Sequence, residues 1–380
     1  MRSIKTKLSG LGMAAAMLLS LAGCNLSTPS SVGSIGGVDI PAGVYLLAQY
    51  NAYNTASGLA DLATGETASD VKAVLKAECT GTIGDEEVTA TGAEYVDKLT
   101  MRALEYYAAV ETKFDELGAT LEDAATSEVA DQVDSMWESN GDLYEANGIG
   151  KNSLQTYLLD AQKASTILTL LYGPDGTEPV TEAEYTDYIN NSCYYIESVQ
   201  IPLVDYSTYT MADDDQKAQI QEIAEQCKEQ LNQQANTEAA TGSALYEAAA
   251  TYVPEAMELI GATMEDASQV MYYAGSQLYT PNDLSSYGDD EYNNLTDPLD
   301  EAGMNQWTVV DLGTTMLVAR RIDPLKTYSV DELTGMYDLL TAMKSDDLQN
   351  QFYADGAAME HNLDEGAMKT YSASKIKKNV

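Results

Sequence analysis

The chain offers few side chains for acid–base or nucleophilic chemistry. Its 380 residues include a single histidine, His361, close to the C-terminus. Histidine is the side chain that most often transfers protons near neutral pH, and His-rich metal sites need several. No Gly-x-Ser-x-Gly motif marks a hydrolase nucleophile. The composition therefore argues against His-rich metal centres and histidine-dependent hydrolases, although the many acidic residues leave a catalytic carboxylate pair open.

One cysteine follows a segment that is typical of export signals. Basic residues precede an apolar run at positions 11–22, which is too short to span a bilayer and predicts a signal peptide over residues 1–23. The run ends in Leu-Ala-Gly-Cys, which resembles the bacterial lipobox and implies a lipid on the sulfur of Cys24. An ordinary secretory signal with a chance cysteine is the alternative. We expect an exported protein that is lipid-anchored through Cys24 to the outer face of the bacterial cell membrane.

The other three cysteines, Cys79, Cys193 and Cys227, form an odd set. At most one disulfide can therefore form, and one thiol is left over. Their spacing matches no zinc or redox motif. We expect buried or reduced thiols.

Acidic residues outnumber basic ones by 60 to 20, which gives a net charge of −40 and a pI near 4.1. Nucleic-acid binders need basic patches, so nucleic acid is not an expected partner. The densest acidic runs, at positions 213–215 and 289–291, lack the spacing of a calcium loop and are expected to be solvated loops or helix starts. No metal or other cofactor is predicted.

Four segments of the first half have the spacing of amphipathic helices. Apolar residues recur at steps of three and four, as they do on the buried face of a helix. Gly118 ends the first segment, and a capping box of Thr181 and Glu184 begins the fourth. The expected helices span residues 92–118, 122–144, 153–172 and 181–190.

The second half mixes strands with helices. Residues 194–205 and 269–273 have strand-like composition, and residues 307–322 form the clearest β-hairpin, with two β-rich arms around a central glycine. Helices are expected over residues 213–236 and from a capping box at Ser329 to Met343. The chain is therefore predicted to be a predominantly helical α+β protein.

Four stretches carry a resemblance to a known family. They are Ile35-Gly36-Gly37-Val38-Asp39-Ile40, Gly148 to Ser153, Val180 to Glu184, and Asn305 to Ile322. With the order of helical block, strand-containing insert and final helix, they resemble the bacterial extracytoplasmic foldases of the SurA and PrsA type. The resemblance implies one helical chaperone module built from both ends of the chain, with a small antiparallel parvulin-type prolyl isomerase domain inserted into it.

This resemblance and the lipobox divide the chain into five segments. They are a signal peptide at 1–23, a flexible Ser/Gly-rich tether at 24–36, the helical module at 37–191, the parvulin-like insert at 192–324, and a C-terminal helical segment at 325–380 that completes the module. The alternative for the insert is a different small α+β domain.

A parvulin-type site would need groups that this insert lacks. Rotation about the bond before proline faces a barrier of about 18–20 kcal/mol. The resemblance implies two histidines beside an apolar cup, and their positions hold Gln200 and Thr315. The cup would be an apolar groove made of Met271, Tyr273, Trp307 and Met316. Without either histidine, we expect a degenerate site and no efficient catalysis.

A foldase-like chaperone is the function that these features favour. The resemblance implies unfolded or partly folded exported polypeptides as partners, and a homodimer is compatible with it. The chain contains 15 Met and 26 Tyr but only 2 Phe, and Met and Tyr suit an adaptable binding surface. Tyrosines at helical core spacing favour ordinary packing instead, as at Tyr95, Tyr106, Tyr107 and Tyr157.

A lipid-anchored solute-binding protein is the competing class. It would share the signal, the anchor and the chain length. Such proteins usually alternate strands and helices in two α/β lobes. The almost wholly helical first half argues against that arrangement.

Overall fold

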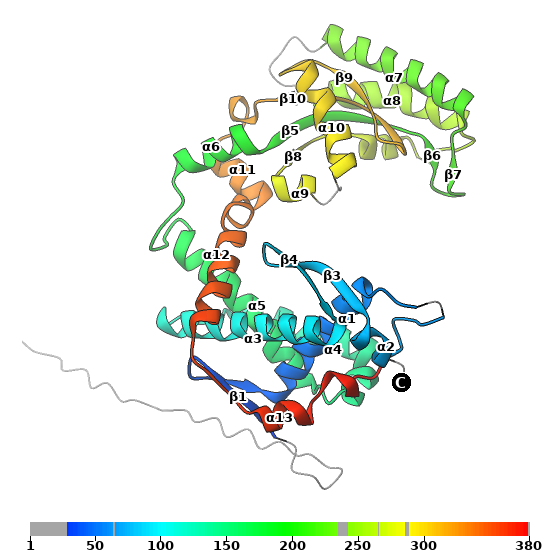
Figure 1. The fold of residues 1–380 in the computed structure, drawn as a ribbon. Coiled ribbons are helices and arrows are strands. Elements are labelled where there is room, and N and C mark those ends of the chain that lie inside the picture. The colour runs from blue at the N-terminus through cyan, green and yellow to red at the C-terminus, as the bar shows by residue number, and fades with distance from the viewer. Residues whose placement is uncertain (1–28, 64, 235–241, 265, 286–288, 379–380) are drawn as a thin grey trace, which may run out of the picture.

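The computed structural model describes residues 29–63, 65–234, 242–264, 266–285 and 289–378. The predicted signal peptide and Cys24 lie outside these residues. The fold is a predominantly helical α+β fold with small antiparallel sheets, as the sequence predicted. Figure 1 shows two groups of elements, which we call the helical lobe (residues 29–172 and 339–378) and the sheet lobe (residues 193–322). The described helices include none that is long and apolar enough to cross a membrane.

Long helices build the helical lobe. They are α1 (Ala42–Leu59), α3 (Gly92–Glu116), α4 (Asp123–Ala146), α5 (Lys151–Tyr172) and α12 (Leu339–Ala358), with the shorter α2 (Val71–Lys76), α13 (Glu365–Thr370) and 3-10 helix η3 (Ala373–Lys375). The predicted helices at 92–118, 122–144 and 153–172 are confirmed. A capping box at Thr91 and Glu94 begins α3, because each side chain satisfies a backbone N–H of the other residue.

Both ends of the chain meet in this lobe. Phe352 of α12 packs with Val110 of α3 and Ile167 of α5 in one apolar cluster. A glycine permits the close crossing of α12 and α3, since a Cβ on Gly356 would lie 2.1 Å from the carbonyl oxygen of Glu105. Helix α12 therefore packs against the first half of the chain, although the whole sheet lobe lies between them in sequence.

The predicted tether is wrong for residues 31–36. Strand β1 (Ser31–Ile35) lies between β2 (Val38–Pro41) and β11 (His361–Leu363) in a three-stranded antiparallel sheet. Val32 and Ile35 of β1 are fully buried. This Ser/Gly-rich segment is ordered because it pairs with two strands. One of them, β11, comes from the other end of the chain and could not be recognised from the neighbouring sequence.

The sequence did not reveal two further elements of this lobe. Helix α1 is apolar on several sides and has no clear polar face. Strands β3 (Glu78–Ile83) and β4 (Glu86–Thr91) form a hairpin directly before α3. Tyr95 of α3 is buried and its hydroxyl donates to the carbonyl of Thr82 in β3.

A four-stranded antiparallel sheet forms the other lobe. Its order is β8 (Ala274–Tyr279), β5 (Tyr194–Pro202), β10 (Thr315–Ile322) and β9 (Thr308–Asp311). The predicted hairpin at 307–322 is confirmed as β9 and β10. Helices α7 (Asp214–Gln234) and α8 (Gly242–Leu259) cover one face, while α9 (Pro281–Ser285) and α10 (Asp289–Ala302) lie on the other (Figure 1). Both acidic runs therefore prove to be helix starts.

The predicted strand at 269–273 is wrong. Residues Ala267–Tyr273 form the 3-10 helix η1, which Asp266 caps by accepting from the backbone N–H of Ser268. The neighbouring strand β8 begins only at Ala274. These residues have the composition of a strand, but the Asp266 cap favours a helical turn over Ala267–Tyr273.

Three short helices join the lobes: α6 (Glu182–Ser192), the 3-10 helix η2 (Pro324–Lys326) and α11 (Val330–Tyr337). The capping boxes predicted at Thr181 and Ser329 are confirmed. The helix expected to continue to Met343 is broken at Asp338, whose φ of 44° is left-handed, and α12 starts after it. Ile189, Ile322 and Leu333 share one apolar cluster at this junction.

The three cysteines of the described residues are free and buried, which confirms the expected thiols. Burial raises the pKa of Cys193 and of Cys227 to about 12 and also raises that of Cys79. A thiol reacts as the thiolate, so these groups are chemically inert in the folded protein.

One buried carboxyl of the helical lobe has an oxygen without a hydrogen-bond partner among the described residues. Asp160 of α5 is 5% exposed, and its Oδ1 has no partner among the described residues. Burial raises its pKa well above the usual value, Glu111 raises it further, and Lys163 opposes the shift. Lys163 and Glu111 instead pair with each other at 2.5 Å. Asp160 therefore destabilises the lobe when it is ionised.

We expect Asp160→Asn to stabilise the protein at neutral pH. In the folded wild-type protein, the Asp160 carboxyl has a higher pKa than in the unfolded chain. Its contribution to the free energy of unfolding therefore falls as the pH rises from the unfolded pKa through the folded pKa. The gain from Asp160→Asn should be absent at low pH and exceed about 1 kcal/mol at neutral pH. Urea denaturation across this pH range measures it. Asp131→Asn on the exposed side of α4 is the control, and an equal gain there would contradict the argument.

Candidate functional site

The two positions that the resemblance assigned to histidines lie on neighbouring strands. Gln200 of β5 is opposite Leu317 of β10, and Thr315 of β10 is opposite Pro202 of β5. Because side chains alternate along a strand, Gln200 and Thr315 share one sheet face. Gln200 is exposed and Thr315 is half-buried. The structure thus brings these two residues to the same end of the sheet.

The predicted apolar groove is wrong in two of its four residues. Trp307 and Met316 are 6% and 2% exposed and belong to the core between the sheet and helices α7 and α8. That core lies on the face opposite Gln200, because Met316 is adjacent to Thr315 in β10. Of the other two, Tyr273 is half-buried and Met271 is 57% exposed. These four side chains therefore do not line one open groove.

A buried ion pair occupies the same face as Met316. The Nε of Arg320 donates to Glu197 Oε2 at 2.8 Å, and the guanidinium lies 4.9 Å from the ring centroid of Trp307. Arg320 is 0% and Glu197 3% exposed. The two residues are cross-strand partners in β10 and β5. This pair links the two central strands in the interior of the lobe, where no substrate can reach it.

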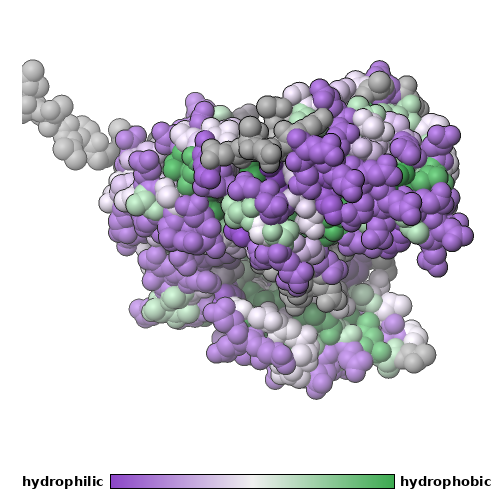
Figure 2. All heavy atoms as spheres, turned by 90° about the horizontal axis from the view of Figure 1, so that it is seen from above, coloured by the Kyte–Doolittle hydropathy of each residue, from purple (hydrophilic) through white to green (hydrophobic). Residues whose placement is uncertain are grey.

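Large apolar side chains are exposed at one end of the sheet lobe. We call them the tyrosine–methionine patch: Tyr206, Tyr209, Met211, Met271 and Tyr272, which are 58%, 82%, 52%, 57% and 76% exposed. They come from the hairpin of β6 (Val204–Asp205) and β7 (Thr210–Met211) and from η1. Figure 2, seen from above, shows a mostly hydrophilic surface on which hydrophobic residues form small separate patches.

Local hydrogen bonds present Tyr209 to solvent. The Asp205 carboxylate accepts from the backbone N–H of Ser207 at 2.8 Å and from the hydroxyls of Ser207 and Thr208 at 2.7 Å. These bonds lower the pKa of Asp205. Tyr209 follows with a φ of 55°, which turns the chain back into β7. The turn is thus closed by its own polar groups, and the tyrosine ring projects from it.

The patch adjoins the sheet end that carries Gln200 and Thr315. The backbone N–H of Leu203 donates to the carbonyl of Thr314 at 2.9 Å, which fixes the β6–β7 hairpin beside the start of β10. Ala274 pairs with Val199, so η1 lies beyond the same end of β5. Burial raises the pKa of Tyr273, and the phenol of Tyr206 raises it further, so η1 and the hairpin are neighbours.

The side chains at this end of the sheet are suited to binding. They are amides, hydroxyls, phenols, thioethers and the carboxylate of Asp205. His361 lies in the helical lobe, where its Nε2 is 3.5 Å from Glu105 Oε1. No group of three or more His, Cys, Asp or Glu residues in the described chain is placed to hold a metal ion. Exposed tyrosine and methionine can contact apolar segments of many shapes.

Sequence analysis missed Tyr206, Tyr209, Met211 and Tyr272. A usable signal was present, since Asp-Tyr-Ser-Thr-Tyr-Thr-Met places three large apolar residues in a turn between a strand and a helix. The tyrosines at helical core spacing are packing residues, as that spacing favoured. Tyr95 and Tyr107 are 1% and 6% exposed, and Tyr106 and Tyr157 are half-buried.

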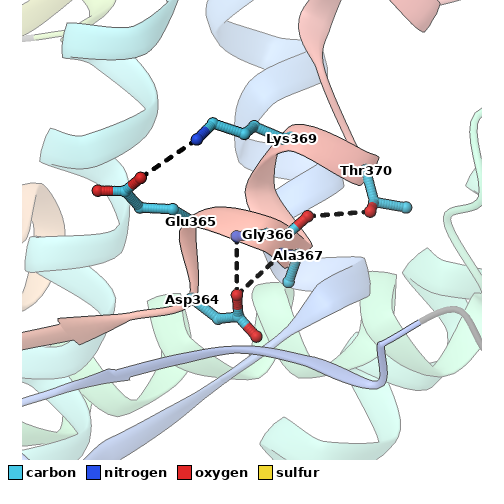
Figure 3. Close-up of polar contacts among 6 residues, drawn as sticks. All are labelled: Asp364, Glu365, Gly366, Ala367, Lys369 and Thr370. Atoms are coloured by element: carbon cyan, nitrogen blue, oxygen red, sulfur yellow. Dashed lines mark hydrogen bonds and ion pairs between the residues drawn. The ribbon is translucent and has the colours of Figure 1, made fainter.

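A separate pocket of about 590 Å³ opens in the helical lobe. Helices α1 and α3 form one side, and α13 with η3 forms the other. Figure 3 shows how Asp364 caps α13 by accepting from the backbone N–H groups of Gly366 and Ala367 at 2.8 and 3.1 Å. Lys369 and Glu365 of α13 pair at 3.2 Å on the same helix.

Polar side chains from α1 and α3 line this pocket. Gln49 is 2% exposed and its Nε2 donates to the hydroxyl of Tyr45 at 2.9 Å. Burial raises the pKa of Tyr45 to about 12, and the Asp97 carboxylate contributes to the shift. The pKa of Asp97 is itself raised, first because the pocket walls partly desolvate this otherwise exposed carboxyl and then because Glu94 is nearby. The three polar groups therefore lie close to one another.

The chain matches no protein-family model and no curated protein. Among solved structures it is similar to the foldase protein PrsA from Streptococcus pneumoniae, with 7% sequence identity and a TM-score of 0.36. The alignment covers 77% of this chain and 98% of that chain. With a TM-score below 0.5, this likeness does not establish a shared fold.

Proposed function

We propose that this protein is a membrane-anchored, foldase-like chaperone that binds unfolded exported polypeptides. The observation that carries the proposal is the tyrosine–methionine patch, because exposed large apolar side chains gathered at one end of a lobe are typical of interaction surfaces. The rigid turn at Asp205 supports it, since an ordered apolar tip loses little conformational entropy on binding.

The charge of the chain fits this role. A net charge of −40 keeps a protein with an exposed apolar patch soluble. Tyrosine also tolerates water through its hydroxyl, so the patch can stay open between binding events. Clients would bind by their apolar segments at the patch, and the acidic surroundings would favour basic clients.

Membrane attachment through Cys24 is part of the same proposal and rests on the lipobox. Incorporation of labelled palmitate in the bacterial host, lost in Cys24→Ser, would support it, and labelling that persists in that variant would contradict it. The proposed chaperone module comprises residues 37–191 and 325–380, with residues 192–324 as the insert. Strand β1 extends the module to residue 31.

Efficient prolyl isomerisation is not part of the proposal. The insert has no histidine, and Gln200 and Thr315 lie on the face opposite Trp307 and Met316. A cis–trans assay with short proline peptides should therefore give a rate close to the uncatalysed one. A high rate that collapses in Gln200→Ala or Thr315→Ala would reverse this conclusion.

The solute-binding alternative has little support. Every strand pairing among the described residues is antiparallel, whereas two α/β lobes of the expected kind have parallel sheets.

The direct test is suppression of client aggregation. The purified protein is mixed with a chemically unfolded protein that aggregates on dilution, and light scattering is followed. We expect suppression near one chaperone per client, because the patch lies at one end of the lobe and offers a single surface. No suppression at a tenfold excess would refute the chaperone proposal.

A further inference from the structure

The pocket between α1, α3, α13 and η3 has features of a ligand site that the chaperone proposal does not use. It is about 590 Å³ in volume, within the range of small-ligand sites. Leu75, Met101 and Met368 supply apolar walls. It lies in the helical lobe, whereas the tyrosine–methionine patch is in the sheet lobe.

Hydrogen-bonding capacity is left over at the pocket lining. The amide nitrogen of Gln49 donates to the hydroxyl of Tyr45, and no hydrogen bond to the Gln49 amide oxygen is found among the described residues. That oxygen is not one of the fully enclosed polar atoms that lack a partner. Both residues line the pocket. An amide oxygen that is neither bonded within the protein nor fully enclosed can accept a hydrogen bond from a molecule in the pocket. A ligand that donates a hydrogen bond to the amide oxygen would complete it.

The charge of the pocket indicates that a ligand with a hydrogen-bond donor should be cationic. Two carboxylates, Asp97 and Glu365, and one ammonium, Lys369, line it. Lys369 pairs with Glu365 at 3.2 Å, while Asp97 has no cation within ion-pair distance in the described part of the chain. Glu94 adds negative potential beside Asp97. The pocket is therefore negative, and an anionic ligand would be repelled.

We propose that this pocket binds the side chain of a lysine in a peptide or protein segment, with its ammonium at Asp97 and Gln49 and its alkyl stem along Leu75, Met101 and Met368. An ammonium carries donors only, which matches a carboxylate and an amide oxygen. A four-carbon stem matches walls of leucine and methionine. The match of both halves of the side chain distinguishes lysine from a purely apolar or a purely ionic ligand.

Saturation-transfer NMR on the purified protein tests this inference. The probes are Nα-acetyl-lysine N-methylamide, the norleucine compound, which lacks the ammonium, and the glutamate compound. We expect saturation of the lysine stem and little or none for the other two. Asp97→Asn should raise the Kd for the lysine compound about tenfold or more, since it removes the charged acceptor.

The control is Asp115→Asn, the same substitution at an exposed position on the same helix. It should leave the Kd unchanged. Asp97 is itself exposed, so its replacement should not unfold the lobe, and circular dichroism checks this. Equal saturation of lysine and norleucine compounds, or an unchanged Kd in Asp97→Asn, would overturn the inference. Nα-acetyl-arginine N-methylamide is measured as a fourth probe, and a stronger signal from it than from the lysine compound would overturn the choice of lysine.

This inference stands apart from the chaperone proposal. If the protein fails to suppress aggregation but binds the lysine compound through Asp97, only the chaperone proposal falls. If it suppresses aggregation and shows no preference for lysine, only the pocket assignment falls.

Discussion

Replacing Tyr209, Met211 and Met271 together with serine is expected to remove most of the suppression of client aggregation. These side chains are 82%, 52% and 57% exposed, so they contribute little to folding and are available to clients. Covering a large apolar side chain is worth about 1.5–3 kcal/mol. The loss of three should weaken client binding by at least about tenfold even after the costs of association. Light scattering with a fixed unfolded client measures the change.

The chain supplies a closely matched control. Tyr246, Met304 and Met336 are also exposed, at 42%, 46% and 53%, but lie outside the patch. Replacing these three with serine removes one tyrosine and two methionines, as the patch variant does. Suppression should then stay near the wild-type level. Equal losses in the two variants would show that general surface hydrophobicity, and not the patch, binds clients.

Removing one partner of the buried ion pair should produce the largest loss of stability. Glu197→Ala leaves the guanidinium of Arg320 buried, fully enclosed and without its 2.8 Å acceptor. Breaking a buried pair in this way costs about 3–5 kcal/mol. The fluorescence of Trp307, which packs on Arg320, reports on this lobe. Urea denaturation in a Trp137→Phe background isolates that signal, because the chain has only 2 tryptophans.

Two comparisons separate the pair from a general effect of mutation. Replacing both Glu197 and Arg320 with methionine should recover much of the loss, since no charge is then left buried. Asp134→Ala breaks the surface ion pair of Lys151 and Asp134, whose side chains are 44% and 64% exposed. This change should lower the free energy of unfolding by less than about 1 kcal/mol. A double variant as unstable as Glu197→Ala would contradict this account.

Local signals predicted the regular elements well. The apolar spacing of α3 and α5 and the capping boxes at Thr181 and Ser329 depend on residues within one or two helical turns, so the sequence specifies them directly. The hairpin at 307–322 is local in the same sense. The failures were non-local. The sequence predicted a flexible tether where β1 lies, because its partner β11 comes from the other end of the chain.

The candidate site was only partly predictable, for a related reason. Composition identified Met271 and Tyr273 as well as Trp307 and Met316, but it could not say which sheet face each residue occupies. Helices α7 and α8 bury Trp307 and Met316. This burial could not be predicted from the types of the two residues. The exposure of Tyr209 depends on a turn closed by Asp205. That turn could have been recognised from its Asp-Tyr-Ser-Thr sequence.

The position of β1 between β2 and β11 has a consequence for the order of folding. During synthesis from the N-terminus, β1 emerges long before β11. Until the final segment emerges, Val32 and Ile35 lack one of their strand neighbours and α3 lacks α12. The sheet lobe is contiguous in sequence and can complete its core earlier. The helical lobe can therefore be completed only after the C-terminal segment is available.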